Sequence, residues 1–245
     1  QKVGRGALPP VATPSMILAL VGQKGGIGKS TTAIALAVAA LERGLRVMLV
    51  DADPQGTVRT WADVAAEQGQ AIPTVLSMGA TMHKADQLPA LARAYDVTLI
   101  DTPARHGDVQ RSALMTAHLA VLPCGPSATD AWALASTLEV VAEARALREQ
   151  LDAAVLITRK QGRTALGRAA RETLATSGLP VLSTELSLRV SYQEAIAAGR
   201  GPTSFAPRDA AAAEVRRLYD ELEALYASRV EDSAVMQRSS LAFVS

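Results

Sequence analysis

Residues 23–32, QKGGIGKSTT, constrain the fold of this chain more than any other stretch. They follow a short apolar run, MILALVG, and lead into STTAIALAVAALERG, which is rich in helix formers and closes at Gly44. A buried strand, a glycine-rich loop and a helix in this order are typical of a phosphate-binding loop, G-x-x-x-x-G-K-[ST]. Gly28, Lys29 and Ser30 fit that pattern, but Gln23 stands where its first glycine belongs, and a second lysine, Lys24, lies inside the loop.

The remaining chain alternates short apolar runs with helical stretches. RVMLV leads to Asp51 and YDVTLI to Asp101, and PTVLS, LAVLP, AAVLITR and LPVLS follow the same pattern, with the clearest helices at 130–150 and 209–227. This alternation predicts an α/β fold, a mostly parallel sheet with helices on both faces. No repeat or long linker divides the chain. We therefore predict a single P-loop NTPase domain at 16–227, a flexible N-terminal extension or cloning remnant at 1–15, and a disordered tail at 228–245.

Length and composition exclude several classes of protein. A chain of 245 residues can bury a full core, and its net charge of +1 does not by itself predict a polyanionic partner. The single cysteine, Cys124, excludes an internal disulfide and fits a reducing cytoplasm. His83, His106 and His118 lack the spacing of metal ligands. No apolar run reaches the roughly 18–20 residues of a membrane span, and no secretory signal is evident, so we expect no stable membrane insertion.

The loop itself predicts a nucleotide phosphate site with Mg²⁺. Gly25, Gly26 and Gly28 allow a tight turn that brings backbone N–H groups close to phosphate oxygens. The N-terminus of the following helix also favours an anion. Lys29 would neutralise the β and γ oxygens, and the Ser30 hydroxyl would be a ligand of Mg²⁺.

Carboxylates follow two of the predicted strands. Because ligands of an open parallel sheet lie beyond the carboxyl ends of its strands, Asp51, Asp53 and Asp101 are expected to converge near the phosphates. Asp101 would hold a magnesium-bound water, and Asp53 would orient an attacking water and lie near the metal. Taken alone, each is more often a turn or capping residue. The predicted metal set is Ser30, Asp53 and Asp101.

Three motifs carry a specific resemblance. KGGIGKST, VDADPQGT and LIDTPA, in this order, resemble the deviant Walker A, switch I and Walker B elements of the ParA/MinD superfamily of ATPases. The likeness extends over about residues 16–227. The stretches DPQGTVRTWAD, VLITRK and AIAAGRGPTSFAPRDAAAAEVRRLYDEL resemble the small ParA-type partition ATPases that lack an N-terminal DNA-reading domain. Glutamine at the first-glycine position is ordinary in that family, so the loop is specialised and not damaged.

The resemblance also implies roles for individual residues. Lys24 matches the signature lysine that reaches across a dimer interface to the phosphates of the other subunit's ATP. Two triphosphates placed face to face repel unless a cation is supplied, so this role is physically sound. Asp53 matches the aspartate that positions the hydrolytic water, and Asp101 matches Walker B. The implied catalytic residues are Lys24, Lys29 and Asp53.

The implied nucleotide contacts extend beyond the loop. Thr31 would contact the α-phosphate, and two segments, 158–160 and 205–208, would flank the base, with Pro207 near adenine. Alternatively, Phe205 and Pro207 simply close the edge of the sheet. The full set is Lys24, Gly25, Gly26, Ile27, Gly28, Lys29, Ser30, Thr31, Thr158, Arg159, Phe205, Pro207 and Arg208.

Basic residues are concentrated towards the C-terminal part of the domain. Residues 160–217 hold nine Lys or Arg against five acidic residues. Basic residues distributed in this way more often form an ordinary solvent-exposed face. The resemblance, however, favours a non-specific, salt-sensitive DNA-binding surface on a dimer. The proposed contributors are Arg163, Arg189, Arg200 and Arg216.

The leading functional hypothesis is a Mg-dependent ATPase whose ATP-bound homodimer coats nucleoid DNA in the bacterial cytoplasm. A cargo-bound adaptor or centromere-binding protein would stimulate hydrolysis and release the dimer. The cargo could be a plasmid or other DNA. Alternatives are a positioning ATPase for protein clusters or organelles, and a MinD-like membrane-surface regulator, for which residues 228–245 show no convincing amphipathic helix. Iron-protein reductases need paired cysteines, and dethiobiotin-synthetase-like ligases lack the signature lysine.

Overall fold

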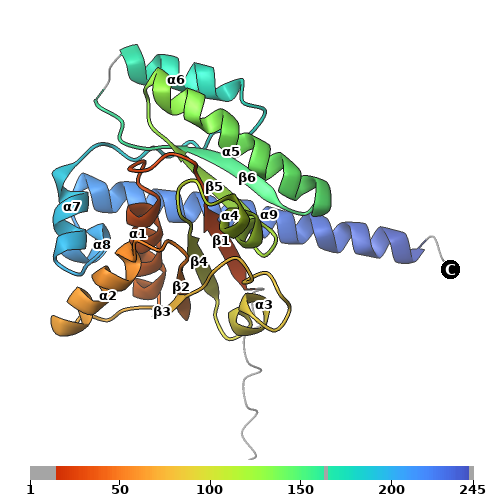
Figure 1. Cartoon of the computed structure of the whole chain (residues 1–245), viewed down its shortest axis with the longest axis horizontal. Coiled ribbons are helices and arrows are strands. Elements are labelled where there is room, and N and C mark those ends of the chain that lie inside the picture. Colours follow the sequence, from red (N-terminus) through yellow and green to blue (C-terminus); the bar gives the residue numbers. More distant parts are fainter. Residues whose placement is uncertain (1–14, 163–164, 243–245) are drawn as a thin grey trace, which may run out of the picture.

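The computed structural model describes residues 15–162 and 165–242 of the chain. All but the last residue of the predicted N-terminal extension lies outside this part. The strands, all parallel, form one six-stranded sheet in the order β3-β2-β4-β1-β5-β6 (Figure 1). The strands are β1 (Met16–Leu20), β2 (Val47–Asp51), β3 (Thr74–Ser77), β4 (Val97–Asp101), β5 (Leu119–Cys124) and β6 (Asp152–Ile157). The predicted α/β fold is confirmed.

Helices cover both faces of the sheet. They are α1 (Lys29–Glu42), α2 (Thr57–Glu67), α3 (Leu88–Ala92), α4 (Gly107–Leu114), α5 (Ala128–Leu147), α6 (Ala165–Ala175), α7 (Val190–Ala197), α8 (Pro202–Phe205) and α9 (Ala210–Ala242). Alternate residues of β1 enter opposite cores: Leu18 packs with α1, α2, α7 and α9, whereas Ile17 packs with α3, α4, α5 and α6. Strands buried on both faces explain why the apolar runs are nearly continuous.

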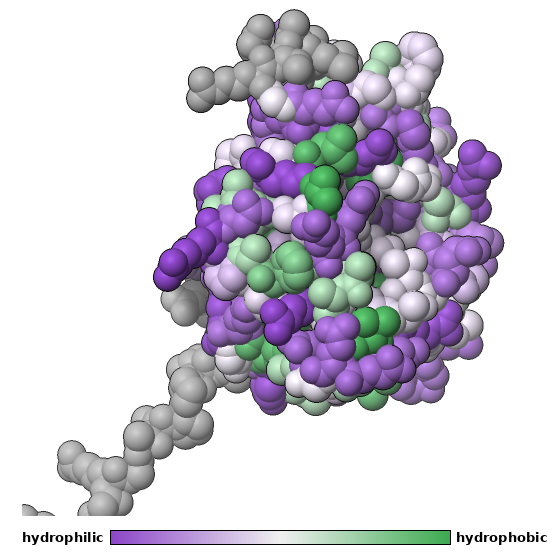
Figure 2. Space-filling model, turned by 90° about the vertical axis from the view of Figure 1, so that its left-hand side faces the viewer, coloured by the Kyte–Doolittle hydropathy of each residue, from purple (hydrophilic) through white to green (hydrophobic). Residues whose placement is uncertain are grey.

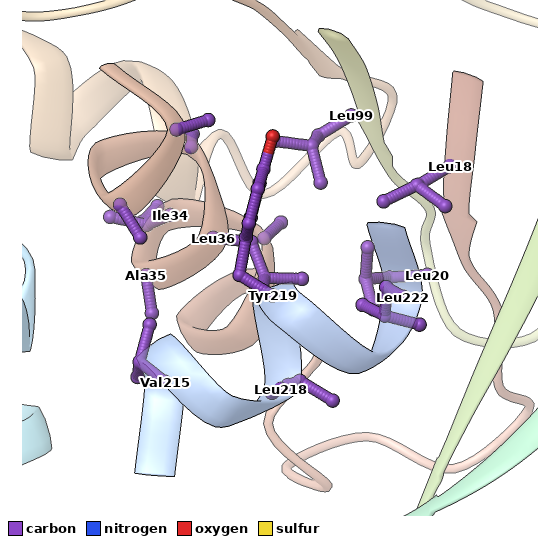
Figure 3. Close-up of a cluster of buried hydrophobic side chains, with 14 of the residues drawn as sticks. Leu18, Leu20, Ile34, Ala35, Leu36, Leu99, Val215, Leu218, Tyr219 and Leu222 are labelled. Atoms are coloured by element: carbon purple, nitrogen blue, oxygen red, sulfur yellow. The ribbon is translucent and has the colours of Figure 1, made fainter. Parts of the chain in front are cut away.

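Helix α1 is held firmly between the sheet and α9. Figure 3 shows Leu36 of α1 beside Tyr219 of α9, and Leu222 of α9 beside Leu20 of β1. These side chains are at most 1% exposed. Because α1 begins at the phosphate-binding loop, this packing fixes the end of the loop relative to the strands.

The C-terminal helix differs from its prediction. Helix α9 continues past Ala227 to Ala242, and its end projects beyond the sheet (Figure 1). Residues 228–242, which were expected to belong to a disordered tail, continue this helix. Tyr226 stacks on His118, and Arg229 forms an ion pair with Asp152 at 3.1 Å. These contacts between distant parts of the chain support the helix where its own apolar period is weak.

One predicted strand is reduced to isolated pairings. The run LPVLS contributes only a bridge between Val181 and Val155, and a second bridge joins Ser187 to Lys160. The segment after Val181 thus follows the edge of β6 without forming a regular strand, and it reaches the end of the sheet where the site lies.

Candidate nucleotide-binding site

Three neighbouring strands end at the phosphate-binding loop. In the sheet register Asp101 at the end of β4 lies beside Leu20 of β1 on one side and Asp51 of β2 on the other. The loop follows directly after β1. The structure therefore brings the glycine-rich loop and two strand-end carboxylates to one edge of the sheet, as expected for the carboxyl ends of parallel strands.

The loop turns through two left-handed glycines. Gly26 has φ 72° and Gly28, the N-cap of α1, has φ 92°. A side chain would strain the backbone at both positions. The N–H groups of residues 25–28 make no hydrogen bond to another described residue. They remain available to an anion at the N-terminus of α1.

The loop carbonyls, in contrast, are held from outside. Thr158 Oγ1 donates to Ile27 O at 2.9 Å, and Arg159 Nη1 donates to Gly26 O at 3.0 Å. Arg159 itself has φ 55°, a left-handed conformation that is unusual for a residue with a side chain. Both residues were predicted to flank the base. In the structure they also fix the orientation of the loop.

A cavity of about 540 Å³ opens over the loop. Its walls come from the loop and the start of α1, from residues 53–57 and from the loop after β4, and they include Lys29, Ser30, Asp53 and His106. For His106 the sequence indicated only that it lacks the spacing of a metal ligand. Its place in the wall depends on the course of the loop after β4, beyond the end of the LIDTPA motif. Lys29 Nζ donates to Lys24 O at 3.2 Å, so its ammonium lies against the loop.

Asp101 meets the main requirement of a magnesium ligand. Its side chain is fully buried, and neither carboxylate oxygen has a hydrogen-bond partner among the described residues. Burial raises the pKa of Asp101 to about 7, although Ser30 and Lys29 act in the opposite direction. The Ser30 hydroxyl is thus near enough to lower the pKa without satisfying either oxygen. A buried, unpartnered carboxylate beside a hydroxyl fits a hard divalent cation.

The protein alone offers few other ligands. Among residues 15–162 and 165–242 there is no group of three or more His, Cys, Asp or Glu side chains that could hold a metal. Magnesium commonly relies on one or two carboxylates, water and substrate phosphates, so this donor set is sufficient. Burial lowers the pKa of Lys29, while Asp101 and Asp53 raise it. These three groups therefore share one electrostatic site.

Asp51, the last residue of β2, and Asp53, which follows the strand, have different environments. Asp51 is buried, and its carboxylate accepts from the backbone N–H groups of Asp53 and Arg59 at 3.2 and 3.0 Å. Its side chain also pairs with the Arg59 guanidinium at 3.3 Å. Asp53 lies in the cavity wall, and its Oδ1 accepts from Gln55 N at 2.9 Å. Asp51 therefore organises the loop, and Asp53 faces the cavity.

Lys24 lies outside this cavity. Its ammonium forms an ion pair with Asp130 of α5 at 2.6 Å; the side chain of Lys24 is 35% exposed and that of Asp130 only 8%. Burial would raise the pKa of Asp130, but Lys24 and Ser127 lower it below its usual value. Asp130 also forms a capping box with Ser127 at the start of α5. Sequence reasoning missed this acidic partner.

A second cavity of about 440 Å³ lies on the other side of the loop. Thr31, Thr158 and Arg159 line it together with Gly26, Gly28 and Thr32. Thr31 was expected at the α-phosphate, and Thr158 and Arg159 beside the base. The rest of the wall was not predicted and comes from Leu186, Ser187, Leu188, Arg189, Tyr192 and Gln193. Hydrogen bonds Lys160 N to Leu186 O and Leu188 N to Lys160 O hold this segment beside the end of β6. The run LPVLS was its only sequence signal.

The structure does not bring Phe205, Pro207 or Arg208 to either cavity. Helix α8, which ends at Phe205, packs against α1 and α9. A Cβ at Gly201, just before α8, would lie 2.7 Å from Val38 of α1. Tight packing therefore holds this segment against α1 and α9, so its main contacts are with helices and do not support the alternative that it closes the edge of the sheet.

The basic residues predicted to contact DNA differ in environment. Arg163 lies outside the described residues. Arg189 forms an ion pair with the buried carboxylate of Glu214 at 2.8 Å. Arg200 donates to Gln70, and Arg216, which is exposed, donates to Pro207 O. Neither Arg200 nor Arg216 forms an ion pair with another described residue, whereas the charge of Arg189 is largely neutralised by Glu214.

Comparisons with known proteins agree with this geometry. The CobQ/CobB/MinD/ParA nucleotide binding domain matches residues 18–203. The maintenance of carboxysome distribution protein A of Halothiobacillus neapolitanus is 31% identical over 84% of this chain and 95% of its own length. The chromosome-partitioning ATPase Soj of Thermus thermophilus is 32% identical over the same shares. The septum site-determining protein MinD of Pyrococcus horikoshii, solved with Mg-ADP, has a TM-score of 0.67 at 21% identity, covering 88% of this chain and 98% of that one, which shows the common fold.

Proposed function

Because this chain belongs to the CobQ/CobB/MinD/ParA nucleotide-binding family, we propose that it is a Mg-dependent positioning ATPase that works as an ATP-dependent homodimer. Its ATP-bound dimer binds DNA without base reading, and a cargo-bound adaptor stimulates hydrolysis. The observation that carries this proposal is the place of Lys24, which stands beside its own phosphate cavity and not in its wall. A lysine in that position is suited to a phosphate supplied by another subunit.

Each group around the 540 Å³ cavity would have a separate role in binding or hydrolysis. The free N–H groups of the loop bind phosphate oxygens, and Lys29 neutralises their charge. Ser30 and Asp101 would hold Mg²⁺, which supplies further charge neutralisation at the β and γ oxygens. Asp53, in the opposite wall, would orient the attacking water. Lys24 of the partner subunit would complete the site, and hydrolysis would weaken the dimer by removing the γ-phosphate contact.

Exposed apolar side chains beside the second cavity, of about 440 Å³, support a protein interface there. Leu188 is 49% exposed and Val190 at the start of α7 is 68% exposed. Figure 2 shows the side of the molecule on which α7 lies, with small apolar groups among hydrophilic ones. Interfaces of this mixed kind suit dimers that form and separate.

Replacing Asp53 with alanine should separate binding from hydrolysis. The Asp53 side chain faces the cavity and holds only Gln55 N, so its loss should leave the loop and Asp101 intact. We expect ATP affinity within about threefold of the parent and hydrolysis reduced by about a hundredfold or more. Equilibrium binding of ATP and steady-state phosphate release measure the two quantities. Loss of nucleotide binding would instead show that Asp53 is structural.

The proposed DNA surface rests on cations without acidic partners. Arg200 and Arg216 meet this condition, and two further exposed arginines, Arg208 and Arg217, have no ion pair among the described residues. Arg189 is the weakest of the original candidates because Glu214 neutralises it. A surface of this kind binds phosphates through charge and is sensitive to salt.

DNA affinity should therefore depend on the nucleotide. Fluorescence anisotropy with a labelled duplex at fixed salt is expected to show at least about tenfold tighter binding with Mg-ATP than with Mg-ADP, because only the dimer combines two basic surfaces. Arg216→Ala should weaken binding, whereas Arg46→Ala, which removes an exposed arginine paired with Asp96, should not. Equal affinity in both nucleotides would contradict the proposal.

The cargo is proposed only as a class. One relative carries a name concerned with carboxysome distribution and another with chromosome partitioning, so both protein-cluster and DNA cargo are consistent with the family. Nucleoid association would follow from the DNA affinity. The MinD-like alternative needs an amphipathic targeting helix, and the continuation of α9 to Ala242 does not supply one, because the apolar period of α9 is weak. No helix in the described part of the chain is both long and apolar enough to cross a membrane. Vesicle co-sedimentation with ATP distinguishes this alternative.

A further inference from the structure

One buried side chain joins two walls of the phosphate cavity. Gln110 of α4 is fully buried, and its amide lies between the beginning of the phosphate-binding loop and the loop that follows β4. Its Nε2 donates to Pro103 O at 2.6 Å and to Gly22 O at 3.3 Å. Its Oε1 accepts from Gln23 Nε2 at 2.9 Å. Both amide hydrogens and the amide oxygen of Gln110 are thus used.

The loop after β4 depends on few such attachments. At its start Thr102 Oγ1 donates to Leu20 O at 2.7 Å. Pro103 has no N–H, and its carbonyl is the one bound by Gln110. The next residues, Ala104 and His106, reach the cavity wall. Gln110 therefore holds the loop immediately before the residues that face the phosphates.

The same loop contains an unfavourable backbone conformation. Arg105 has φ 62° between two residues of the cavity wall. A left-handed conformation of a non-glycine residue costs on the order of 1 kcal/mol and persists only where its surroundings impose it. The Gln110 amide on one side and the start of α4 on the other provide that constraint. The Gln110 amide and the start of α4 thus bracket the strained residue.

This arrangement explains Gln23 in physical terms. At the position where the usual loop has glycine, the side chain of Gln23 reaches the Oε1 atom of Gln110. A glycine there would leave this buried oxygen without its partner, at a cost of about 1–3 kcal/mol. The departure from the usual loop pattern thus creates a contact between the phosphate-binding loop and α4.

We propose that Gln110 is a positioning residue for hydrolysis: it couples the phosphate-binding loop to the loop after β4 and sets the position of Ala104 and His106 over the phosphates. The inference rests on the proposed ATPase function. Gln110 touches no reacting atom and acts through Pro103, Gly22 and Gln23. Its contribution is to the rate of the chemical step, because nucleotide binding is supplied by residues 25–31.

The test is Gln110→Met, which keeps a similar volume and removes all three hydrogen bonds. We expect kcat for ATP to fall about ten- to thirtyfold, while KM and the Kd of Mg-ADP stay within about threefold. Hydrogen exchange gives a readout that does not need turnover. In the parent, Mg-ADP should slow exchange of the amides of residues 104–107, and in Gln110→Met this protection should be lost although the nucleotide still binds.

Ser112→Ala is the matched control on the same helix. Ser112 is buried, and its Oγ accepts from His83 N at 3.1 Å, away from the cavity. This variant should lower Tm without changing kcat or the protection by Mg-ADP. If Gln110→Met behaves in the same way, Gln110 is only structural and the inference is overturned. A parent protein that does not hydrolyse ATP would refute the proposed function. The hydrogen-exchange comparison of the parent with Gln110→Met needs no turnover, so it tests the inference separately.

Discussion

Asparagine at position 101 is expected to remove hydrolysis while making the nucleotide-free protein more stable near neutral pH. The carboxylate of Asp101 is buried without a hydrogen-bond partner, so its charge is unfavourable until a cation binds. Asn keeps the shape and removes the charge. We expect hydrolysis to fall by about a hundredfold or more and the unfolding free energy to rise by about 1–3 kcal/mol at pH 8.

The direction of the change in unfolding free energy follows from the direction of the pKa shift. Burial raises the pKa of Asp101 from 3.8 in the unfolded chain to about 7 in the folded protein. The protonated form therefore favours folding below about pH 4, and this stabilisation is lost progressively as the pH rises to about 7. Asp101→Asn does not titrate, so its advantage over the parent should be absent at low pH and complete at about pH 8.

Thermal unfolding at several pH values, without nucleotide, measures this difference. At pH 8 Asp101→Asn should melt about 2–8 °C above the parent, and the gap should close towards pH 4. Saturating Mg-ADP should stabilise the parent more than the variant, because Asp101 would help to hold the ion. A variant that is less stable at every pH would show that Asp101 has an unseen partner and would weaken its assignment to the metal.

The family and the fold could be predicted because their signals are local. The spacing of Gly28, Lys29 and Ser30 and the apolar runs that end at Asp51 and Asp101 are read within a few residues. Strands, sheet layers and the family all agree with those signals. Helix α1 ends at Glu42, two residues before Gly44, which has φ 79°.

The features that escaped prediction depend on contacts between distant residues. Asp130 lies 106 positions from Lys24, and Gln110 lies 87 positions from Gln23. Nothing in the sequence near either lysine or glutamine specifies such a partner. The wall formed by residues 186–193 and the continuation of α9 likewise arise from pairing with β6 and from packing on the sheet. Local patterns therefore located the loop, but not the groups that control its side chains.

Lys24→Ala should abolish the ATP-dependent dimer. If Lys24 neutralises the phosphates bound by the partner subunit, its removal leaves two facing polyanions with one cation fewer at each site. We expect the dimer Kd in Mg-ATP to rise by about a hundredfold or more, with Mg-ADP affinity of the monomer nearly unchanged. Analytical ultracentrifugation with a slowly hydrolysed ATP analogue measures the first quantity. A dimer as strong as that of the parent would remove the main support for the proposed function.

Asp130→Asn should act in the opposite direction. In the structure the Lys24 ammonium is engaged by Asp130 of its own chain, and this pair must open before Lys24 can reach another subunit. A partly exposed pair of this kind contributes about 1 kcal/mol or less, which is at most about fivefold. Two such pairs open when the dimer forms, so their loss should tighten the ATP-dependent dimer by up to about 25-fold. Asn can still accept from Ser127 N, which preserves the start of α5. If Asp130→Asn weakens the dimer as Lys24→Ala does, Asp130 instead orients Lys24 within the dimer. The two variants therefore decide between two roles of the ion pair. Either Asp130 competes with the other subunit's phosphates for Lys24, or it orients Lys24 towards those phosphates.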